Sequence, residues 1–320
     1  MSAAVLRTLA GTRDVSGQPD LSVVVLSWNT QELTRACLKT LLGREHGLDL
    51  EVIVVDNASK DGSVEMVAGE FPEALLVCNS ENNGYAGGNN QGMARARAPY
   101  VLLLNSDTEV NGDAFSRLLS FLRDHPDHGA VAPRLSNPDG SVQRACMTFP
   151  NLMVGLLYDS MWDRWRKRCA PVRRYFMEDF DHEHSRDVDQ PPGAAFLVRR
   201  EVIEQVGDFD ENLWLFFNDV DLCKRITRAG WKIHYLAETE ILHHGGSSTK
   251  KFPDFVRTWN LNRVRYYRKH HGLLGAWVIK ASVTLRALEE MAKVLVRTPS
   301  GQRKAGVGSV LQVLGATLRA

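Results

Sequence analysis

The chain has 320 residues, and its 39 Lys and Arg nearly balance its 38 Asp and Glu, for a formal net charge of +1. That balance gives no electrostatic reason to expect nucleic acid as a partner. Hydrophobic residues make up 44% of the chain and charged residues 24%, which excludes a disordered chain and is typical of a globular protein with a sizeable core.

The five cysteines are odd in number and scattered, which fits neither a disulfide framework nor a zinc cluster. We therefore expect reduced thiols and a cytoplasmic protein, with a peripheral position on the inner face of the plasma membrane as a further hypothesis. No signal-peptide pattern opens the chain, and no run of about 18 apolar residues predicts a membrane span. Residues 1–20 are predicted to be a flexible leader.

Strands and helices are predicted to alternate from residue 21 onward. Apolar β-branched runs indicate strands, and stretches with apolar residues on one helical face indicate helices. In chain order the predicted elements are a strand at 21–29, a helix at 30–42, a strand at 50–59, a helix at 61–71, a strand at 74–80, a Gly- and Asn-rich segment at 81–92 and a strand at 100–110. This alternation predicts βαβ units and a mostly parallel sheet.

Three of these strands end in polar residues. The sequences "LSWN", "VVDN" and "LLNSD" place Ser27 and Asn29, Asp56, and Asn105 and Asp107 after buried runs. Ligands of open α/β sheets bind beyond the carboxyl ends of the strands, so these tips predict a nucleotide-type site.

Asp107 and Asp56 each allow two interpretations. A carboxylate such as Asp107 at a strand tip can bind Mg²⁺ or Mn²⁺ when a diphosphate and waters complete the ligand set, but a plain turn also favours Asn, Ser and Asp. Asp56 could accept the N3–H of uracil or thymine, or could form an Asx-turn or a helix cap.

The segment "NNGYAGGNNQG", which includes Gly84, matches neither the dinucleotide fingerprint nor a P-loop. Its glycines predict a backbone that approaches a ligand closely.

The second half of the chain supplies two further candidates. In "FFNDVDLCKR", Asp219 is either a general base in a partly apolar site or the cap of a helix. Its neighbours Trp214, Asn218 and Asp221 are candidates for the acceptor side. In "ILHHGGSST", His243 is either a metal ligand or a structural histidine.

Together these motifs resemble the family 2 glycosyltransferases with a GT-A fold, and in particular the rhamnosyltransferase-like branch. The resemblance rests on "VVVLSWN", "VVDNASKDGS", "NNGYAGGNNQG", "LLLNSDT", "GAAFLVRREVIEQVGDFDENLWLFFNDVDLCKR" and "ILHHGGSST". It covers roughly residues 21–249, about 70% of the chain. It implies an α/β GT-A fold with a mostly parallel central sheet flanked by helices.

The resemblance also implies roles for individual residues. Asp107 would be the metal-binding Asp of a degenerate D-x-D motif, in which Asn105 stands where relatives carry the first Asp. His243 would be a further metal ligand in a pattern completed by Gly246 and Ser248. Asp219 would be the catalytic base. The donor nucleotide would lie against Ser27, Asn29, Asp56, Gly84 and Asn105, with Asp56 on the pyrimidine.

The implied organisation is a GT-A catalytic domain at 21–250, with a donor half at about 21–135 and an acceptor half at about 136–250. A helical extension follows at 251–320. Its basic and aromatic residues leave three interpretations open: helices packed on the catalytic domain, a dimer helix, or an amphipathic helix on a membrane surface.

The implied reaction is inverting, metal-assisted transfer of a sugar, with L-rhamnose as the first guess. The donor would be a dTDP- or UDP-sugar and the acceptor a hydroxyl of a glycan or lipid-linked glycan. A catalytically silent GT-A module that binds nucleotide or glycan is the alternative. A nucleotidyltransferase would need a Gly-rich, basic phosphate loop after the first strand, which "SWNTQELTRACLKTLL" lacks.

Overall fold

The computed structural model describes residues 7–9, 17–43, 45–158, 169–245, 254–297 and 299–320. The chain forms two compact units. The first comprises Met1–Met147, Asp181–Glu211 and Asn218–Phe252, and the second comprises Thr148–Phe180, Asn212–Phe217 and Pro253–Ala320. Each unit is described by itself.

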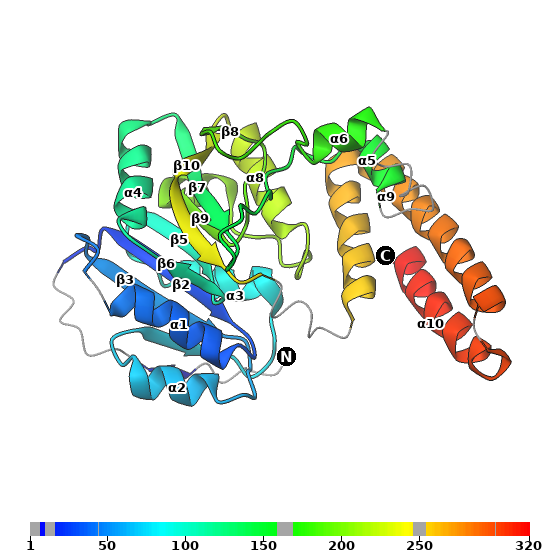
Figure 1. Cartoon of the computed structure of the whole chain (residues 1–320), viewed down its shortest axis with the longest axis horizontal. Coiled ribbons are helices and arrows are strands. Elements are labelled where there is room, and N and C mark those ends of the chain that lie inside the picture. Colours follow the sequence, from blue (N-terminus) through cyan, green and yellow to red (C-terminus); the bar gives the residue numbers. More distant parts are fainter. Residues whose placement is uncertain (1–6, 10–16, 44, 159–168, 246–253, 298) are drawn as a thin grey trace. The chain divides into compact units, whose positions relative to one another are not determined.

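The first unit contains one mixed sheet (Figure 1). Its strands follow the order β1-β4-β3-β2-β5-β9-β7-β10-β6, with β8 paired to β10. Their bounds are β1 Arg7–Leu9, β2 Leu21–Ser27, β3 Leu50–Asp56, β4 Leu75–Cys78, β5 Tyr100–Asn105, β6 Thr108–Val110, β7 His128–Ser136, β8 Arg186–Asp187, β9 Ala195–Arg199 and β10 Lys232–His243.

Strand direction differs between the two halves of the sheet. Strands β4, β3, β2 and β5 run parallel, as predicted for the donor half. Strand β9 is antiparallel to β5 and β7, while β10 is parallel to β7 and antiparallel to β6 and β8. The short strand β1, which pairs with β4, lies inside the leader that we expected to be loose.

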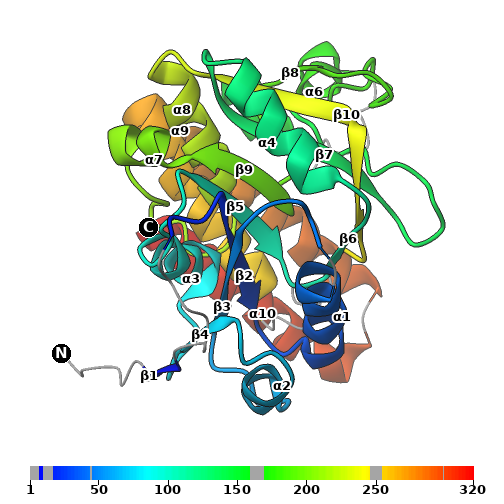
Figure 2. The same ribbon diagram turned by 90° about the vertical axis from the view of Figure 1, so that its left-hand side faces the viewer.

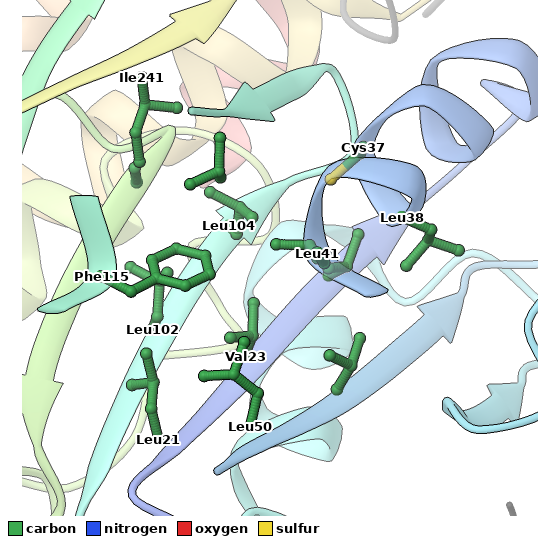
Figure 3. Packing of buried hydrophobic residues seen from close by; sticks show 14 of the residues in the cluster. Leu21, Val23, Cys37, Leu38, Leu41, Leu50, Leu102, Leu104, Phe115 and Ile241 are labelled. Atoms are coloured by element: carbon green, nitrogen blue, oxygen red, sulfur yellow. The ribbon is translucent and has the colours of Figure 1, made fainter. Parts of the chain in front are cut away.

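Helices cover both faces of this sheet, and Figure 2 shows α1 and α3 on opposite sides of β2. The helices of the unit are α1 Gln31–Leu42, α2 Ser63–Glu70, α3 Gly84–Met93, α4 Ala114–Asp124, α7 Arg200–Val206 and α8 Asn218–Arg228. Side chains alternate along a strand, so Val23 and Val25 face one layer of helices and Val24 faces the other. The core on the first side joins Cys37 and Leu38 of α1 to Phe115 of α4 (Figure 3).

Glycines bring α3 close to the sheet. A Cβ on Gly88 would lie 2.4 Å from Leu26 Cδ1, and one on Gly92 would lie 2.2 Å from Val24 Cγ1. Two glycines four residues apart therefore form the face of α3 that packs on β2. Part of the Gly-rich motif thus serves helix–sheet packing, and the close approach of its backbone to a ligand stays a prediction.

The second unit is helical. Its helices are α5 Leu152–Leu157, α6 Ala170–Tyr175, α9 Phe255–Arg297 and α10 Ser300–Arg319, and α9 is interrupted at Gly272, where φ is 65°. Within this unit the Arg263 guanidinium donates to the carbonyls of Gly155 and Tyr158, and the Tyr267 hydroxyl donates to Asn151 O. No helix in the described part of the chain is long and apolar enough to cross a membrane.

The unit boundary differs from the predicted domain boundary. The described residues of 148–158, 169–180 and 212–217, which we assigned to the acceptor half, belong to the same unit as the C-terminal helices, and within that unit α5 packs against α9. The extension predicted at 251–320 is helical, because α9 and α10 contain all of its described residues except Asp254, Pro299 and Ala320.

Candidate active site

The turn between β5 and β6 places Asp107 beside the end of β10. Strand β6 pairs antiparallel with β10, with Thr108 opposite His243. The two side chains predicted to bind metal consequently meet, because His243 Nε2 lies 3.3 Å from Asp107 Oδ1. Both side chains are largely buried, at 14% and 9% exposed. The predicted partners Gly246 and Ser248 lie outside the described residues.

Hydrogen bonds define which ring nitrogen of neutral His243 carries the proton. Gln143 Nε2 donates to Asn137 Oδ1 and to His243 O, both at 2.7 Å, so the other amide atom, Gln143 Oε1, is an acceptor. His243 Nδ1 lies 2.8 Å from that oxygen and must carry a proton to bond to it. In the neutral ring, Nε2 then presents a lone pair toward the Asp107 carboxylate.

Two acceptors that face each other at 3.3 Å call for a cation or a proton between them. The pair of imidazole nitrogen and carboxylate oxygen suits a divalent transition metal, so of the two ions that the resemblance implies the donor set fits Mn²⁺ better than Mg²⁺. The neighbouring His244 is engaged elsewhere, with its Nε2 2.7 Å from Glu109 Oε1.

Asp56 is buried at the tip of β3, and only one of its two carboxylate oxygens has a hydrogen-bond donor among the described residues. Its Oδ1 accepts the backbone N–H of Ser59 at 2.8 Å. Its Oδ2 is buried and has no hydrogen-bond partner among the described residues. Burial raises the pKa of this carboxyl group above its ordinary value. A buried acceptor without a donor is costly, and a ligand N–H would offset that cost.

Ser27 has a different position from the one we predicted. Its side chain is fully buried, and its hydroxyl lies 3.0 Å from the Thr34 hydroxyl and 3.4 Å from that of Thr30. Thr30 in turn contacts the Ser106 hydroxyl at 3.0 Å. Ser27 therefore supports the strand tips from beneath and does not line the site with its side chain.

The remaining donor-side candidates lie at turns. Asn29 has a φ of 53°, and its side-chain oxygen accepts the N–H of Lys60 at 2.8 Å, which fixes the loops after β2 and β3 to each other. Gly84 also has positive φ, at 72°, where α3 begins. Asn105 ends β5, with its carbonyl accepting from the Thr108 hydroxyl at 2.8 Å.

Asp219 lies in the first turn of α8. The residue before this helix, Phe217, has a φ of 64°, which is uncommon for a bulky side chain and is a form of strain found at functional sites. Asp219 Oδ1 accepts the Val220 N–H at 2.8 Å, and Gln190 Nε2 is 3.5 Å from Asp219 Oδ2. Burial raises the pKa of this half-buried carboxyl, as a general base requires.

Tyr85, which the sequence did not single out, lies beside the candidate base Asp219. Its hydroxyl donates to Gly193 O at 3.0 Å, and its ring lines a small cavity together with Asp219 and Phe209. Burial raises the pKa of this hydroxyl, and the charges of Asp219 and Asp107 add to the shift. The sequence signal that could have identified Tyr85 is its position as an aromatic residue inside the glycine motif.

The three acceptor-side candidates differ in their surroundings. Asp221 has a fully buried side chain and forms an ion pair with Arg225, which lies 2.9 Å away on the next turn of α8. Asp221 therefore stabilises the helix and presents no carboxylate to an acceptor. Asn218 is buried, and its Oδ1 accepts the Asp219 N–H at 2.7 Å, which holds the backbone of the first turn of α8. Trp214 belongs to the second unit.

Known proteins resemble this chain over most of its length. An L-rhamnosyltransferase from Mycobacterium tuberculosis, named N-acetylglucosaminyl-diphospho-decaprenol L-rhamnosyltransferase, is 28% identical over 254 residues, which cover 74% of this chain and 82% of the relative. The O-antigen biosynthesis protein RfbC of Myxococcus xanthus is 27% identical over 74% of this chain but only 18% of its own length.

Solved structures share the fold at low identity. The mannosyltransferase PcManGT from Pyrobaculum calidifontis, in complex with GDP-Man and Mn²⁺, has a TM-score of 0.54 and 17% identity over 95% of this chain and 87% of its own. GalNAc-T7 with UDP, GalNAc and Mn²⁺ has a TM-score of 0.53 and 14% identity over 78% of this chain and 50% of its own. These likenesses confirm the predicted GT-A fold.

The family profile "Glycosyl transferase family 2" matches residues 22–207, more than half of the chain. The matched segment contains every strand tip described above except the end of β10. The chain therefore belongs to glycosyl transferase family 2 and is a glycosyltransferase.

Proposed function

We propose that this enzyme transfers L-rhamnose, with inversion, from a dTDP- or UDP-activated donor to a hydroxyl of a lipid-linked glycan in cell-envelope polysaccharide synthesis. The sugar and acceptor class come from the mycobacterial rhamnosyltransferase, which is 28% identical over 254 residues. The observation that carries the chemistry is the pairing of Asp107 with a His243 ring whose lone pair faces it.

The donor base would bind at Asp56. Its unpartnered Oδ2 would accept the N3–H that uracil and thymine possess and cytosine lacks. Asn29, Gly84 and Asn105 would surround the nucleotide at the neighbouring strand and helix ends. Ser27 would act indirectly, through the hydroxyl network that supports this edge.

The diphosphate would bind near Asp107 and His243. A Mg²⁺ or Mn²⁺ ion held there would neutralise charge that develops on the departing nucleoside diphosphate. Gln143 would keep His243 in the tautomer that leaves Nε2 available. Asn105, which occupies the place of the first Asp of D-x-D, would contribute a neutral amide to this edge.

Asp219 would accept the proton of the attacking hydroxyl. Its raised pKa makes it a better base than an ordinary surface carboxylate, while Gln190 and the Val220 N–H orient its two oxygens. A single base without a nucleophilic partner fits one displacement, in which the hydroxyl attacks opposite the leaving group and configuration inverts.

The second unit would contact the membrane that carries a lipid-linked acceptor. Beside the interruption of α9 at Gly272, the large apolar side chains of Leu273, Leu274 and Trp277 are 63–69% exposed. The exposed residues Arg268 and Lys269 precede them. Apolar groups next to basic ones suit an anionic membrane surface. Self-association through α9 would cover the same residues.

Calorimetry with dTDP and UDP, each with and without Mn²⁺, tests the proposal. We expect tight, metal-dependent binding of one nucleotide, and loss of the metal dependence in Asp107→Ala. Transfer of rhamnose to a lipid-linked acceptor by the same preparation would complete the assignment. A folded protein that binds neither nucleotide would instead be a silent member of the fold.

Vesicles separate the two interpretations of the exposed α9 residues. We expect the protein to co-sediment with anionic vesicles at low salt, and the variant Trp277→Ser/Leu274→Ser to remain in the supernatant. A concentration-dependent dimer that the same variant dissociates, without any vesicle binding, would assign these residues to self-association.

A further inference from the structure

We propose a second divalent-metal site, formed by His128, Asp187 and His234, at the end of the sheet away from the catalytic residues. One nitrogen from each ring and one carboxylate oxygen lie within 4.8 Å of one another. Two imidazoles and one carboxylate favour Zn²⁺ or a related transition metal, and such three-residue sets leave positions for water.

The ligand atoms come from three separate strands. His128 begins β7, Asp187 ends β8, and His234 lies near the start of β10. The parallel pairing of β7 with β10 and the pairing of His234 with Asp187 across β8 and β10 bring them together. His243, at the other end of β10, is nine residues away, roughly 30 Å along a strand.

The contact distances fit a small ion with modest adjustment. His128 Nε2 lies 2.9 Å and His234 Nδ1 2.7 Å from the same oxygen, Asp187 Oδ1. Ligand atoms around tetrahedral Zn²⁺ stand about 3.4 Å apart, given Zn–N distances of about 2.0–2.1 Å. Side chains that move apart by less than about 1 Å would thus make room for the ion.

The number of N–H donors on the His128 ring also favours a cation in this position. His128 Nδ1 lies 2.8 Å from Asp127 Oδ1, so both nitrogens of this ring face carboxylates. A neutral imidazole has one N–H, which leaves a lone pair facing one of those oxygens. If that N–H points to Asp127, Nε2 is free to bind metal and Asp127 completes a carboxylate–histidine–metal arrangement.

The surroundings hold these rings in place. The Phe121 ring stacks on His234 with centroids 4.3 Å apart and meets the His128 ring edge-on at 5.2 Å. Lys232 Nζ holds the second oxygen of Asp127 at 2.7 Å. Asp187 is 49% exposed, so water could complete the coordination. A bound ion would join the short edge strand β8 to β7 and β10, which is a structural role.

Metal titration of an Asp107→Ala/His243→Ala variant, untagged and freed of metal by a chelator, isolates this second site. We expect about one equivalent of Zn²⁺ to bind by calorimetry, and Co²⁺ to show visible absorption bands typical of a four- or five-coordinate ion. Added to that background, His234→Ala and Asp187→Asn should each weaken Zn²⁺ affinity about a hundredfold, and Asp127→Asn about tenfold.

His184→Ala is the matched control, because that histidine contacts Asp181 on the exposed surface and belongs to no such cluster among the described residues. It should bind Zn²⁺ like its parent. Circular dichroism would verify folding, and if His234→Ala does not fold, the exposed Asp187→Asn decides. Absence of micromolar Zn²⁺ binding, or binding unaffected by both ligand variants, overturns the proposal.

Discussion

His243 points its Nε2 at the Asp107 carboxylate from 3.3 Å, and this contact joins two motifs that lie 136 residues apart in the chain. The antiparallel pairing of β6 with β10 creates it. Because Nδ1 of the same ring is engaged by a side-chain amide, the geometry assigns Nε2 as the available atom. The first prediction follows from this relationship.

Removal of His243 should weaken the metal dependence of nucleotide binding. We expect His243→Ala and Asp107→Ala each to lower Mn²⁺ affinity by about tenfold or more, and Gln143→Leu by about tenfold, because the tautomer is no longer held. Calorimetry with Mn²⁺ and the preferred nucleotide measures this. His244→Ala, whose ring contacts Glu109, is the matched control and should bind normally.

Asp219→Asn should abolish transfer and preserve donor binding. Loss of a general base costs about 10²–10⁴ in rate, whereas an isosteric amide keeps the shape of the first turn of α8. The rate of rhamnose transfer and the Kd of the nucleotide are the two measurements. If Kd rose as steeply as the rate fell, Asp219 would bind the donor or hold the fold instead.

The raised pKa of Asp219 predicts two pH effects. The rate should rise with pH as this carboxyl loses its proton, with a midpoint above the ordinary value of 3.8. Stability should change in the opposite sense, because ionisation is less favourable in the folded state than in the unfolded state. Wild type therefore loses stability as pH rises from the unfolded pKa through the folded one.

The variant Asp219→Asn lacks that loss, so at about pH 7 it should have a higher Tm than wild type, and the two should converge near about pH 3. Thermal unfolding at a series of pH values tests this. A Tm of the variant that stays below that of wild type at every pH would contradict it.

Asp56→Asn should lose base selectivity. The carboxylate can only accept a hydrogen bond when ionised, so it should favour UDP or dTDP over CDP, which lacks an N3–H. We expect the variant to bind its preferred nucleotide at least tenfold more weakly, about 1.4 kcal/mol, and to discriminate less against CDP. Competition binding with the three nucleotides provides the comparison, and equal selectivity in both proteins would count against a base contact.

Gly92→Ala should destabilise the catalytic domain. The added Cβ would meet Val24 Cγ1 at 2.2 Å, and overpacking of this kind costs about 1–3 kcal/mol. Gly69→Ala in α2 is the matched control, because nothing lies within 4 Å of its Cβ and alanine favours a helix by about 0.8–1.0 kcal/mol. Denaturant unfolding should show opposite shifts for the two variants.

The donor half of the fold was predictable from sequence because its strands are short apolar runs, rich in β-branched residues in β2 and β3. Strands β2 and β3 begin where predicted and end two and three residues early, whereas the run predicted at 100–110 divides into β5 and β6. The polar tips of β2, β3 and β5 meet at one edge of the sheet. The division into units was not predictable, because the residues at 148–180 become part of the helical unit only through packing against α9.

The candidate site, too, was predictable from the sequence only in part. The order of the motifs identified Asp56, Asp107, Asp219 and His243 as candidates. The structure brings Asp107 and His243 into contact. The burial of Ser27 depends on hydroxyl partners that no strand pattern reveals. Asp221 was the avoidable error, because Arg225 four residues later is the spacing of an ion pair on a helix.

The proposed second metal site had no signal in the sequence. His128, Asp187 and His234 are separated by 59 and 47 residues, and none of the short spacings that mark metal sites connects them. Only strand pairing reveals the group, which the spacing of the cysteines could not.

The paired glycines of α3 carry no side chain, so the backbone of the helix packs directly against the side chains of β2. They determine how near the helix axis comes to β2, and thereby where the first turn of α3 delivers Tyr85 toward Gly193. The shape of the cavity beside Asp219 thus depends on residues that do not line it. In this chain, Gly88 and Gly92 therefore set the distance between α3 and the sheet.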